Sequence, residues 1–129
     1  MDQPLKPETW DEVLARHTPE VQTAAHSMLG LILEELPDAV VRFDRGNGLL
    51  AVGTGSGMQD LLFALIPHAG WLNLQLADGA VLPNPDGLIE GTGKRIRHIK
   101  IRSAEAASSP AVRAAVRAQI AARNPRTDG

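Results

Sequence analysis

The stretch Trp71-Leu72-Asn73-Leu74-Gln75-Leu76 alternates between apolar and polar side chains without a break. Successive side chains of a strand point to opposite faces of a sheet, so the pattern predicts a strand with one face in the core and the other toward solvent. Half-covered strands of this kind are typical of antiparallel sheets, because strands of parallel sheets are covered on both faces and read as continuous apolar runs. Leu72, Leu74 and Leu76 form the predicted core side.

The segments on either side of this strand carry strand patterns of their own. Leu61–Ile66 is continuously apolar, which is expected of a central strand with both faces covered. Ile96–Arg102 alternates again and places Ile99 and Ile101 on the inner face. Between the last two strands, residues 78–87 are rich in turn-forming types, so we expect a loop there.

Earlier in the chain the pattern predicts a β-hairpin. Val41–Asp44 alternates, Arg45-Gly46-Asn47-Gly48 supplies a turn, and Leu49–Val52 is the returning strand. Gly53-Thr54-Gly55-Ser56-Gly57 comes next and resembles a phosphate-binding loop at first sight. No helix pattern follows it, so it is better explained as a connection between strands.

Helices are predicted on both sides of the strand region. A short one spans Glu8–Arg16. A longer one begins at Thr18-Pro19, a capping residue followed by a proline that suits the first turn, and stops at Pro37. The last helix begins at Ser109-Pro110 and ends at Asn124-Pro125. The apolar positions recur every three or four residues, as Val21, Ala25, Met28, Leu29, Ile32 and Leu36 in the longer helix and Val112, Ala115, Val116 and Ile120 in the last.

Helices first, then consecutive strands, then a helix is an order typical of an α+β fold rather than of alternating βαβ units. We therefore expect an antiparallel or mixed sheet of about five strands, packed on one face by the N-terminal and C-terminal helices. The 129 residues are predicted to form a single domain, 1–129. The chain has no cysteine, so packing alone must hold the fold.

The composition disfavours several classes of protein. The formal net charge of −2 argues against nucleic acid as a partner. No run approaches the ~18 apolar residues that a membrane helix requires, and the first residues do not resemble a signal peptide. A cytoplasmic protein without a membrane partner is therefore expected.

The most distinctive stretch is Gly91–Arg102, where a glycine loop runs into a strand dense in cations. Glycines let backbone N–H groups turn toward an anion, and flanking cations add Coulomb attraction. The stretch is not a P-loop, because Arg95 replaces the hydroxyl residue and a strand follows in place of a helix. The predicted ligand-binding residues are Gly91, Gly93, Lys94, Arg95, Arg97, His98 and Lys100. The alternative is a solvated strand face whose glycines serve a tight turn.

Other chemistry has weaker support. Asp78, Asp86 and Glu90 fall in one loop and could chelate a hard cation, although their spacing matches no calcium loop. His98 could act as a general base near two of these carboxylates, but only if the fold brings them together. We therefore predict no catalytic residue, no metal ligand and no cofactor. The outward-facing Trp71 would suit a homodimer interface, or it covers the edge of the sheet.

The chain contains the segments Ala64-Leu65-Ile66-Pro67 with Trp71-Leu72-Asn73-Leu74, Gly79-Ala80-Val81-Leu82-Pro83, and Gly87-Leu88-Ile89-Glu90-Gly91-Thr92-Gly93 followed by Arg97-His98. Together these segments resemble the YdhG-like family of uncharacterised bacterial domains. The resemblance extends from Thr18 to the last helix and implies a compact α+β domain. One branch of the family includes an iron chaperone whose fold is similar to frataxin, which would imply an acidic iron-binding surface. Here the most recognisable segment is basic.

Three functions are consistent with these observations. The favoured one is a non-catalytic binding module for a small anionic ligand or an acidic partner protein, based on the Gly91–Arg102 segment. The second is an iron-binding chaperone of the frataxin-like type, which rests on analogy of fold and cannot by itself establish function. The third, ranked last, is a hydrolase or other enzyme that uses His98.

Overall fold

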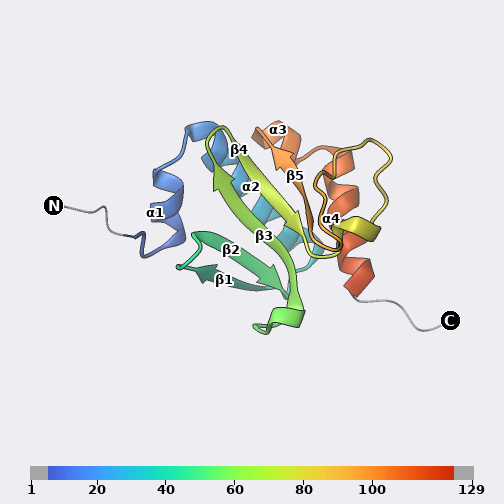
Figure 1. Cartoon of the computed structure of the whole chain (residues 1–129). Coiled ribbons are helices and arrows are strands. Elements are labelled where there is room, and N and C mark those ends of the chain that lie inside the picture. The colour runs from blue at the N-terminus through green and yellow to red at the C-terminus, as the bar shows by residue number, and fades with distance from the viewer. Residues whose placement is uncertain (1–5, 124–129) are drawn as a thin grey trace.

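Five strands form one antiparallel sheet in which each strand pairs with its neighbour in the sequence, in the order β1-β2-β3-β4-β5. The computed structural model describes residues 6–123. The expected α+β class is confirmed, and all four strand pairs are antiparallel. The strands are β1 (Val40–Asp44), β2 (Leu49–Gly53), β3 (Leu61–His68), β4 (Trp71–Leu76) and β5 (Arg97–Ile101) (Figure 1).

The helices lie where the sequence predicts them, with one addition. Thr18 accepts a hydrogen bond from the Val21 N–H at 3.3 Å, and Ser109 accepts one from the Val112 N–H at 3.3 Å, so both predicted caps are confirmed. The expected helix end at Asn124-Pro125 lies outside the described residues. The helices are α1 (Trp10–Ala15), α2 (Pro19–Glu35), the additional α3 (Ala104–Ala107) and α4 (Pro110–Arg123), and the 3₁₀ turns are η1 (Met58–Asp60) and η2 (Gly79–Val81).

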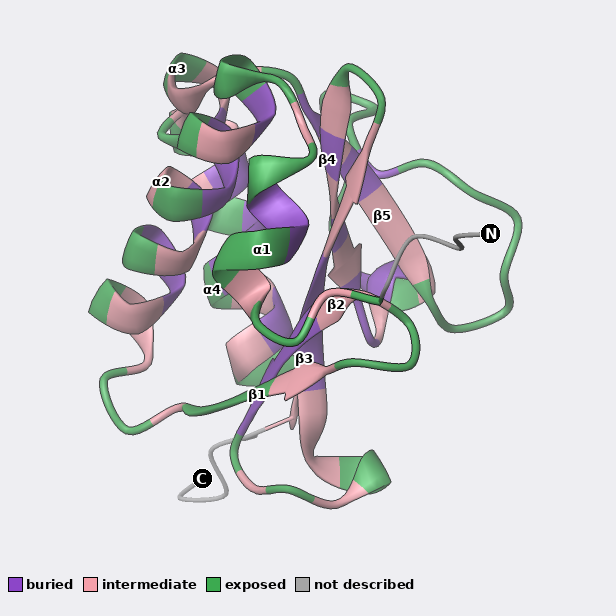
Figure 2. Cartoon of the chain, turned by 90° about the vertical axis from the view of Figure 1, so that its left-hand side faces the viewer, coloured by how far each residue is buried: buried purple, intermediate pink, exposed green. Residues whose placement is uncertain are grey.

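The core lies between the sheet and the helices α2 and α4, which both cover the same face (Figure 1). The register places Phe63 opposite Leu76, and Leu65 opposite Leu74, and all four side chains are completely buried. Buried residues line the sides of α2 and α4 that look toward the strands (Figure 2). The alternation that predicts the inner side of β4 is therefore confirmed.

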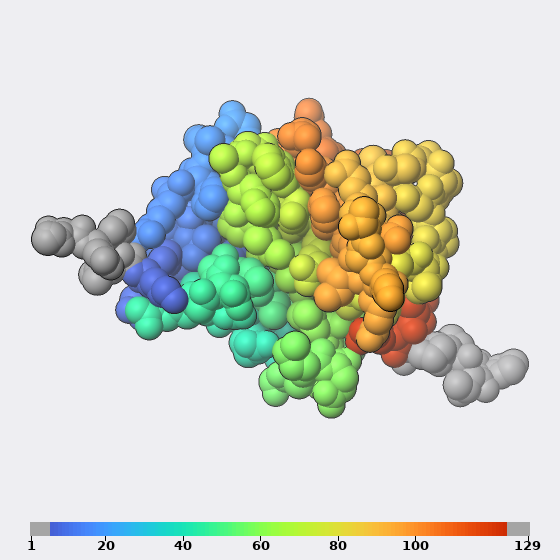
Figure 3. Space-filling view, viewed as in Figure 1, coloured from blue at the N-terminus to red at the C-terminus, as the bar shows by residue number. Residues whose placement is uncertain are grey.

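The opposite face of the sheet, here called the outer face, is not covered by a helix within residues 6–123, and β3 and β4 reach the surface at its centre (Figure 3). Even so, Ala64 on this face of β3 is only 1 % exposed. This agrees with the prediction of a central strand covered on both sides. Toward β4 and β5 the outer face becomes polar.

The inner stripe of α4 differs from the sequence-based expectation at one position. Ile120 is the expected core residue, but it is half-buried, whereas Gln119 is completely buried. The Gln119 side chain is tolerated there because its amide oxygen accepts a hydrogen bond from the Asp78 N–H at 2.7 Å and its amide nitrogen donates to Asp78 Oδ2 at 2.7 Å.

The glycine-rich connection after β2 closes on itself. A Cβ at Gly53 would lie 2.1 Å from the carbonyl oxygen of Asp60, so only glycine permits this close approach. The Thr54 N–H donates to that same oxygen at 3.0 Å, and the Gly57 N–H donates to Asp60 Oδ2 at 3.1 Å. The glycines serve a strand connection, as expected.

Candidate functional site

The structure divides the predicted basic segment between a loop and the outer face of the sheet. Glu90 and His98 form an antiparallel bridge, with reciprocal backbone hydrogen bonds of 2.7 and 3.0 Å, and this bridge closes the loop 91–97. Lys94 and Arg95 lie on the exposed loop. His98 and Lys100 lie on β5, opposite Gln75 and Asn73 of the outer face.

Within the loop, the glycines are explained by backbone geometry. A Cβ at Gly93 would lie 2.4 Å from the Ile96 carbonyl oxygen, and Gly91 has a φ of 118°, which side-chain-bearing residues rarely adopt. The Nε of Arg97 donates to the Gly93 carbonyl oxygen at 3.0 Å, so this cation stabilises the turn. Lys94 is exposed and has no hydrogen-bond or ion-pair partner among residues 6–123.

On the outer face, Trp71 is the centre of a cluster that we call the Trp71 cluster. Its indole Nε1 donates to Asn73 Oδ1 at 2.8 Å, and Asn73 Nδ2 lies 3.2 Å from His68 Nε2. The His68 ring stacks on the indole at 5.1 Å between centroids, with an interplanar angle of 15°. Lys100 Nζ lies 4.9 Å from the ring centroid and Arg102 Cζ lies 5.8 Å from it. Arg102 is thus the second cation at this aromatic ring. It is absent from the predicted ligand-binding residues, although the alternation of Ile96–Arg102 places it on this face.

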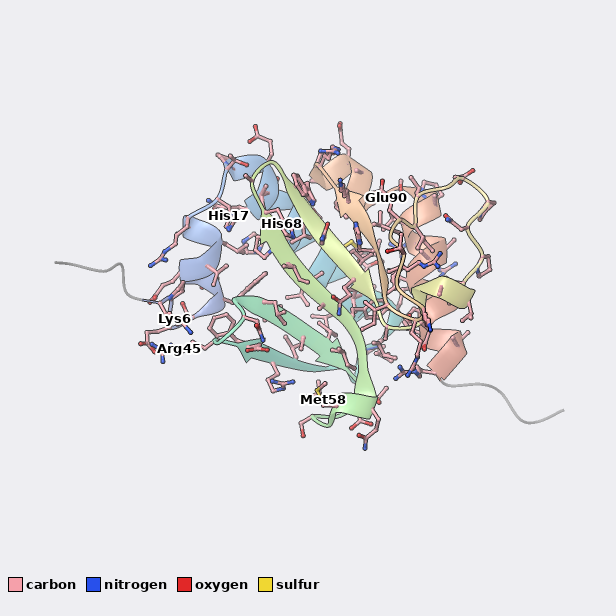
Figure 4. The ribbon with its side chains drawn as sticks, viewed as in Figure 1. Lys6, His17, Arg45, Met58, His68 and Glu90 are labelled. Atoms are coloured by element: carbon pink, nitrogen blue, oxygen red, sulfur yellow. The ribbon has the colours of Figure 1, made fainter. Side chains whose placement is uncertain are left out.

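Glu90 is the acidic neighbour of this face. Its Oε1 lies 3.8 Å from His98 Nε2 and 3.9 Å from Lys100 Nζ, beyond hydrogen-bond distance in both cases. The Glu90 side chain is 50 % exposed, and exposed ion pairs of this kind contribute at most about 1 kcal/mol. Lys100 therefore retains donors for another anion. Figure 4 shows Glu90 on the loop beside β5 and His68 at the end of β3, near the turn to β4.

Arg95, by contrast, is engaged with an acid. Its guanidinium donates to Asp78 Oδ1 at 3.0 Å, and Arg123 Nε lies 2.8 Å from Asp78 Oδ2. Burial works to raise the pKa of Asp78, but the hydrogen bonds from Gln119 and Arg95 and the charge of Arg123 outweigh it. The pKa therefore lies below its usual value. This ion-pair network joins the end of β4 to α4.

The folded chain should lose stability in acid for the same reason. The pKa values of Asp78, Glu35 and Asp44 are lowered, for Glu35 chiefly by the hydrogen bond from Arg117 and for Asp44 by that from Asn47. A carboxyl group whose pKa is lower in the folded chain than in the unfolded chain stabilises the fold at pH values above its unfolded pKa. This contribution is lost as the pH falls through the folded pKa. The unfolded values are 4.5 for Glu35 and 3.8 for the two aspartates.

We therefore expect the urea midpoint to hold steady above about pH 5 and to fall progressively below it. Urea unfolding at a series of pH values, followed by circular dichroism, measures this. The Asp78→Asn variant should show a weaker decline below pH 3.8, because one of the contributing carboxyls is gone. A wild-type midpoint that stays constant from neutral pH to pH 3.8 would contradict the expectation.

The three acids of the 78–90 region do not come together. Asp78 pairs with Arg95 and Arg123, Glu90 faces β5, and Asp86 lies at the rim of a cavity beside α4. Among residues 6–123, no group of three or more histidine, aspartate or glutamate side chains is arranged to hold a metal ion. Of the two carboxylates considered as neighbours for His98, Glu90 lies near its ring, and Asp86 makes no ion pair within the described chain.

Comparison with known proteins identifies no relative of this chain. No family model matches the chain, and no match was found among curated proteins or solved structures. The resemblance to the YdhG-like family therefore stays a prediction. None of the helices in the described part of the chain has the length and apolar character needed to cross a bilayer.

Proposed function

We propose that this protein is a non-catalytic binding module for an anion, either a small ligand or an acidic group on a partner, and that the anion binds Lys100 and Arg102 on the outer face. The observation that carries the proposal is the placement of both cations against one indole ring, at 4.9 and 5.8 Å from its centroid. Two positive charges so close together attract a carboxylate or phosphate more strongly than either does alone.

The support beneath these cations favours binding without large rearrangement. The Trp71 ring is held by the hydrogen bond to Asn73 and by stacking against His68. A cation over an exposed aromatic ring gains about 0.5–1 kcal/mol, which helps to hold long side chains in place before a ligand arrives. Ordering a flexible side chain on binding costs about 0.5–1.5 kcal/mol, so a pre-placed pair binds more tightly than two mobile cations.

The chemistry of the pair suits an oxyanion. The Arg102 guanidinium can donate two parallel hydrogen bonds to one carboxylate or phosphate, and the Lys100 ammonium acts as a point charge beside it. His98 lies on the same face of β5 as Lys100, whereas Lys94 and Arg95 precede β5 and lie at the opposite end of that strand from Arg102. The two positive charges beside Trp71 contrast with the net charge of −2 for the whole chain, and they would steer an anion to this end of the sheet.

The proposal predicts that the Lys100→Ala/Arg102→Ala double variant loses anion binding. The indole N–H signal of Trp71 in a ¹⁵N–¹H spectrum is a direct probe, because that group lies within the cluster. Wild-type protein titrated with citrate or inorganic phosphate should show a saturable shift of this signal, and a glutamate-rich peptide tests the acidic-partner form. The double variant should show none, while its free energy of unfolding changes by no more than about 1 kcal/mol, since Arg102 is exposed and Lys100 is only half-buried.

Two further variants make the test specific. The Lys6→Ala/Arg45→Ala variant removes the same charge at the other end of the sheet (Figure 4) and should bind as the wild type does. The Lys94→Ala/Arg97→Ala variant tests the loop itself. Loss of binding only in the loop variant would move the site to residues 91–97 and overturn the assignment to Lys100 and Arg102.

A further inference from the structure

A cavity of about 180 Å³ lies between α4 and the loop that precedes Glu90, and the proposed anion site does not use it. One wall is a row of small side chains on α4, and the floor is Ile89 and Ile99, both buried. The residues that line it are Ala111, Ala114, Ala115 and Ala118 of α4, Pro83, Asn84, Pro85, Asp86, Leu88 and Ile89 of the loop, and Ile99 of β5.

The loop wall is shaped independently of any ligand. Asn84 clamps the loop because its Nδ2 donates to the Ile89 carbonyl oxygen at 2.9 Å and its Oδ1 accepts from the Ile89 N–H at 2.9 Å. The Gly87 N–H donates to the Asn84 carbonyl oxygen at 3.2 Å, and Pro83 and Pro85 fix their own backbone angles. These contacts also satisfy the polar groups of the Asn84 side chain, which leaves the cavity lining mainly apolar.

The volume indicates the size of a suitable occupant. An apolar cavity of about 150 Å³ admits a benzene ring, and water in such a cavity finds few hydrogen-bond partners. The alanine wall is too short to fill the space, and the clamped loop holds the other wall in place. A single six-membered ring or a branched alkyl group therefore fits this space.

The charge at the rim indicates what such a ligand carries. Asp86 is the one ionisable residue in the lining, and it is exposed. It has no ion pair or hydrogen bond with any other residue in the described range 6–123. A carboxylate at the mouth of an apolar cavity attracts an ammonium group and repels an anion. We propose that this cavity binds a small aromatic or branched alkyl amine, with the apolar group between α4 and the loop and the ammonium beside Asp86.

Three probes of one shape and different charge test the proposal. These are phenethylamine, 2-phenylethanol and phenylacetate, each titrated into ¹⁵N,¹³C-labelled protein. We expect phenethylamine to shift the methyl signals of Ile89, Ile99 and Ala115, and to bind about fivefold more tightly than phenylacetate. In the Asp86→Asn variant this preference should fall to about twofold or less. Equal binding of the amine and the carboxylate by the wild type would overturn the assignment of an amine.

Filling the cavity provides the second test. Ala115→Leu adds three carbon atoms at its deepest alanine and should abolish the shifts at Ile89 and Ile99, and Ala118→Leu, at a less buried position, serves if that variant does not fold. Ala15→Leu makes the same change at an exposed position of α1 and should bind as the wild type does. Binding that persists in a folded filled variant, shifts confined to the Trp71 cluster, or no shift with any probe would each overturn the proposal.

Discussion

Replacing Asp78 with alanine should lower the free energy of unfolding by about 3 kcal/mol. The carboxylate accepts from Gln119 Nε2 at 2.7 Å and pairs with Arg123 Nε at 2.8 Å, and its side chain is only 12 % exposed. Removing one member of a buried ion pair leaves the other charge without its partner, and the completely buried Gln119 amide also loses its acceptor. Most of the lost stability comes from leaving Arg123 and Gln119 without this carboxylate as a partner, and less from the missing contact itself.

Urea unfolding followed by circular dichroism measures the change, and an unaltered m value would show that the unfolded state is the same. Asp38→Ala is the matched control, because Asp38 is exposed and its replacement should change the free energy of unfolding by less than about 0.5 kcal/mol. A loss of less than about 1 kcal/mol in Asp78→Ala would mean that solvent replaces the carboxylate, and the network would then not stabilise the junction of β4 and α4.

The Phe63→Ala variant should be destabilised by about 4 kcal/mol. Phe63 is completely buried on β3, with Leu76 on one neighbouring strand and Val52 on the other. Truncation removes the transfer free energy of the ring and leaves a cavity. Because β3 is hydrogen-bonded to a strand on each side, the backbone cannot easily move to close that cavity. The same urea experiment measures the effect.

Met58→Ala provides the comparison for this truncation. Met58 is 83 % exposed on η1, at the edge of the molecule (Figure 4), so its loss should change the free energy of unfolding by less than about 0.5 kcal/mol. Equal effects of the two substitutions would indicate that the face between the sheet and the helices is not the core of the folded protein.

The fold was predictable because its signals are local. The alternation of Trp71–Leu76 predicts which side chains meet the helices, and the same reasoning places Ile99 and Ile101 inward, as observed. Helix starts are equally local, since a cap depends on residues three positions apart, such as Thr18 and Val21. The antiparallel order follows when each strand pairs with the next one along the chain.

The site was less predictable because its contacts join distant residues. Gln119 lies 41 positions from Asp78, so nothing in the local pattern explains why a glutamine is buried or why Asp78 is held by cations rather than chelating one. Likewise, the bridge between Glu90 and His98 decides which cations face solvent. Arg102 was the exception, because the alternation of Ile96–Arg102 already places it beside Lys100 on the outer face.

The order of the sheet has a consequence for how the chain folds during synthesis. β3 and β4 are joined by Ala69 and Gly70 alone, and β1 and β2 by residues 45–48, so their pairing closes short loops at little entropic cost. These hairpins can form as soon as they leave the ribosome. The Asp78 carboxylate, however, finds Gln119 and Arg123 only after α4 has been made. We therefore expect the docking of α4, not strand pairing, to complete folding, with the part of the sheet that α4 covers exposed to chaperones until then.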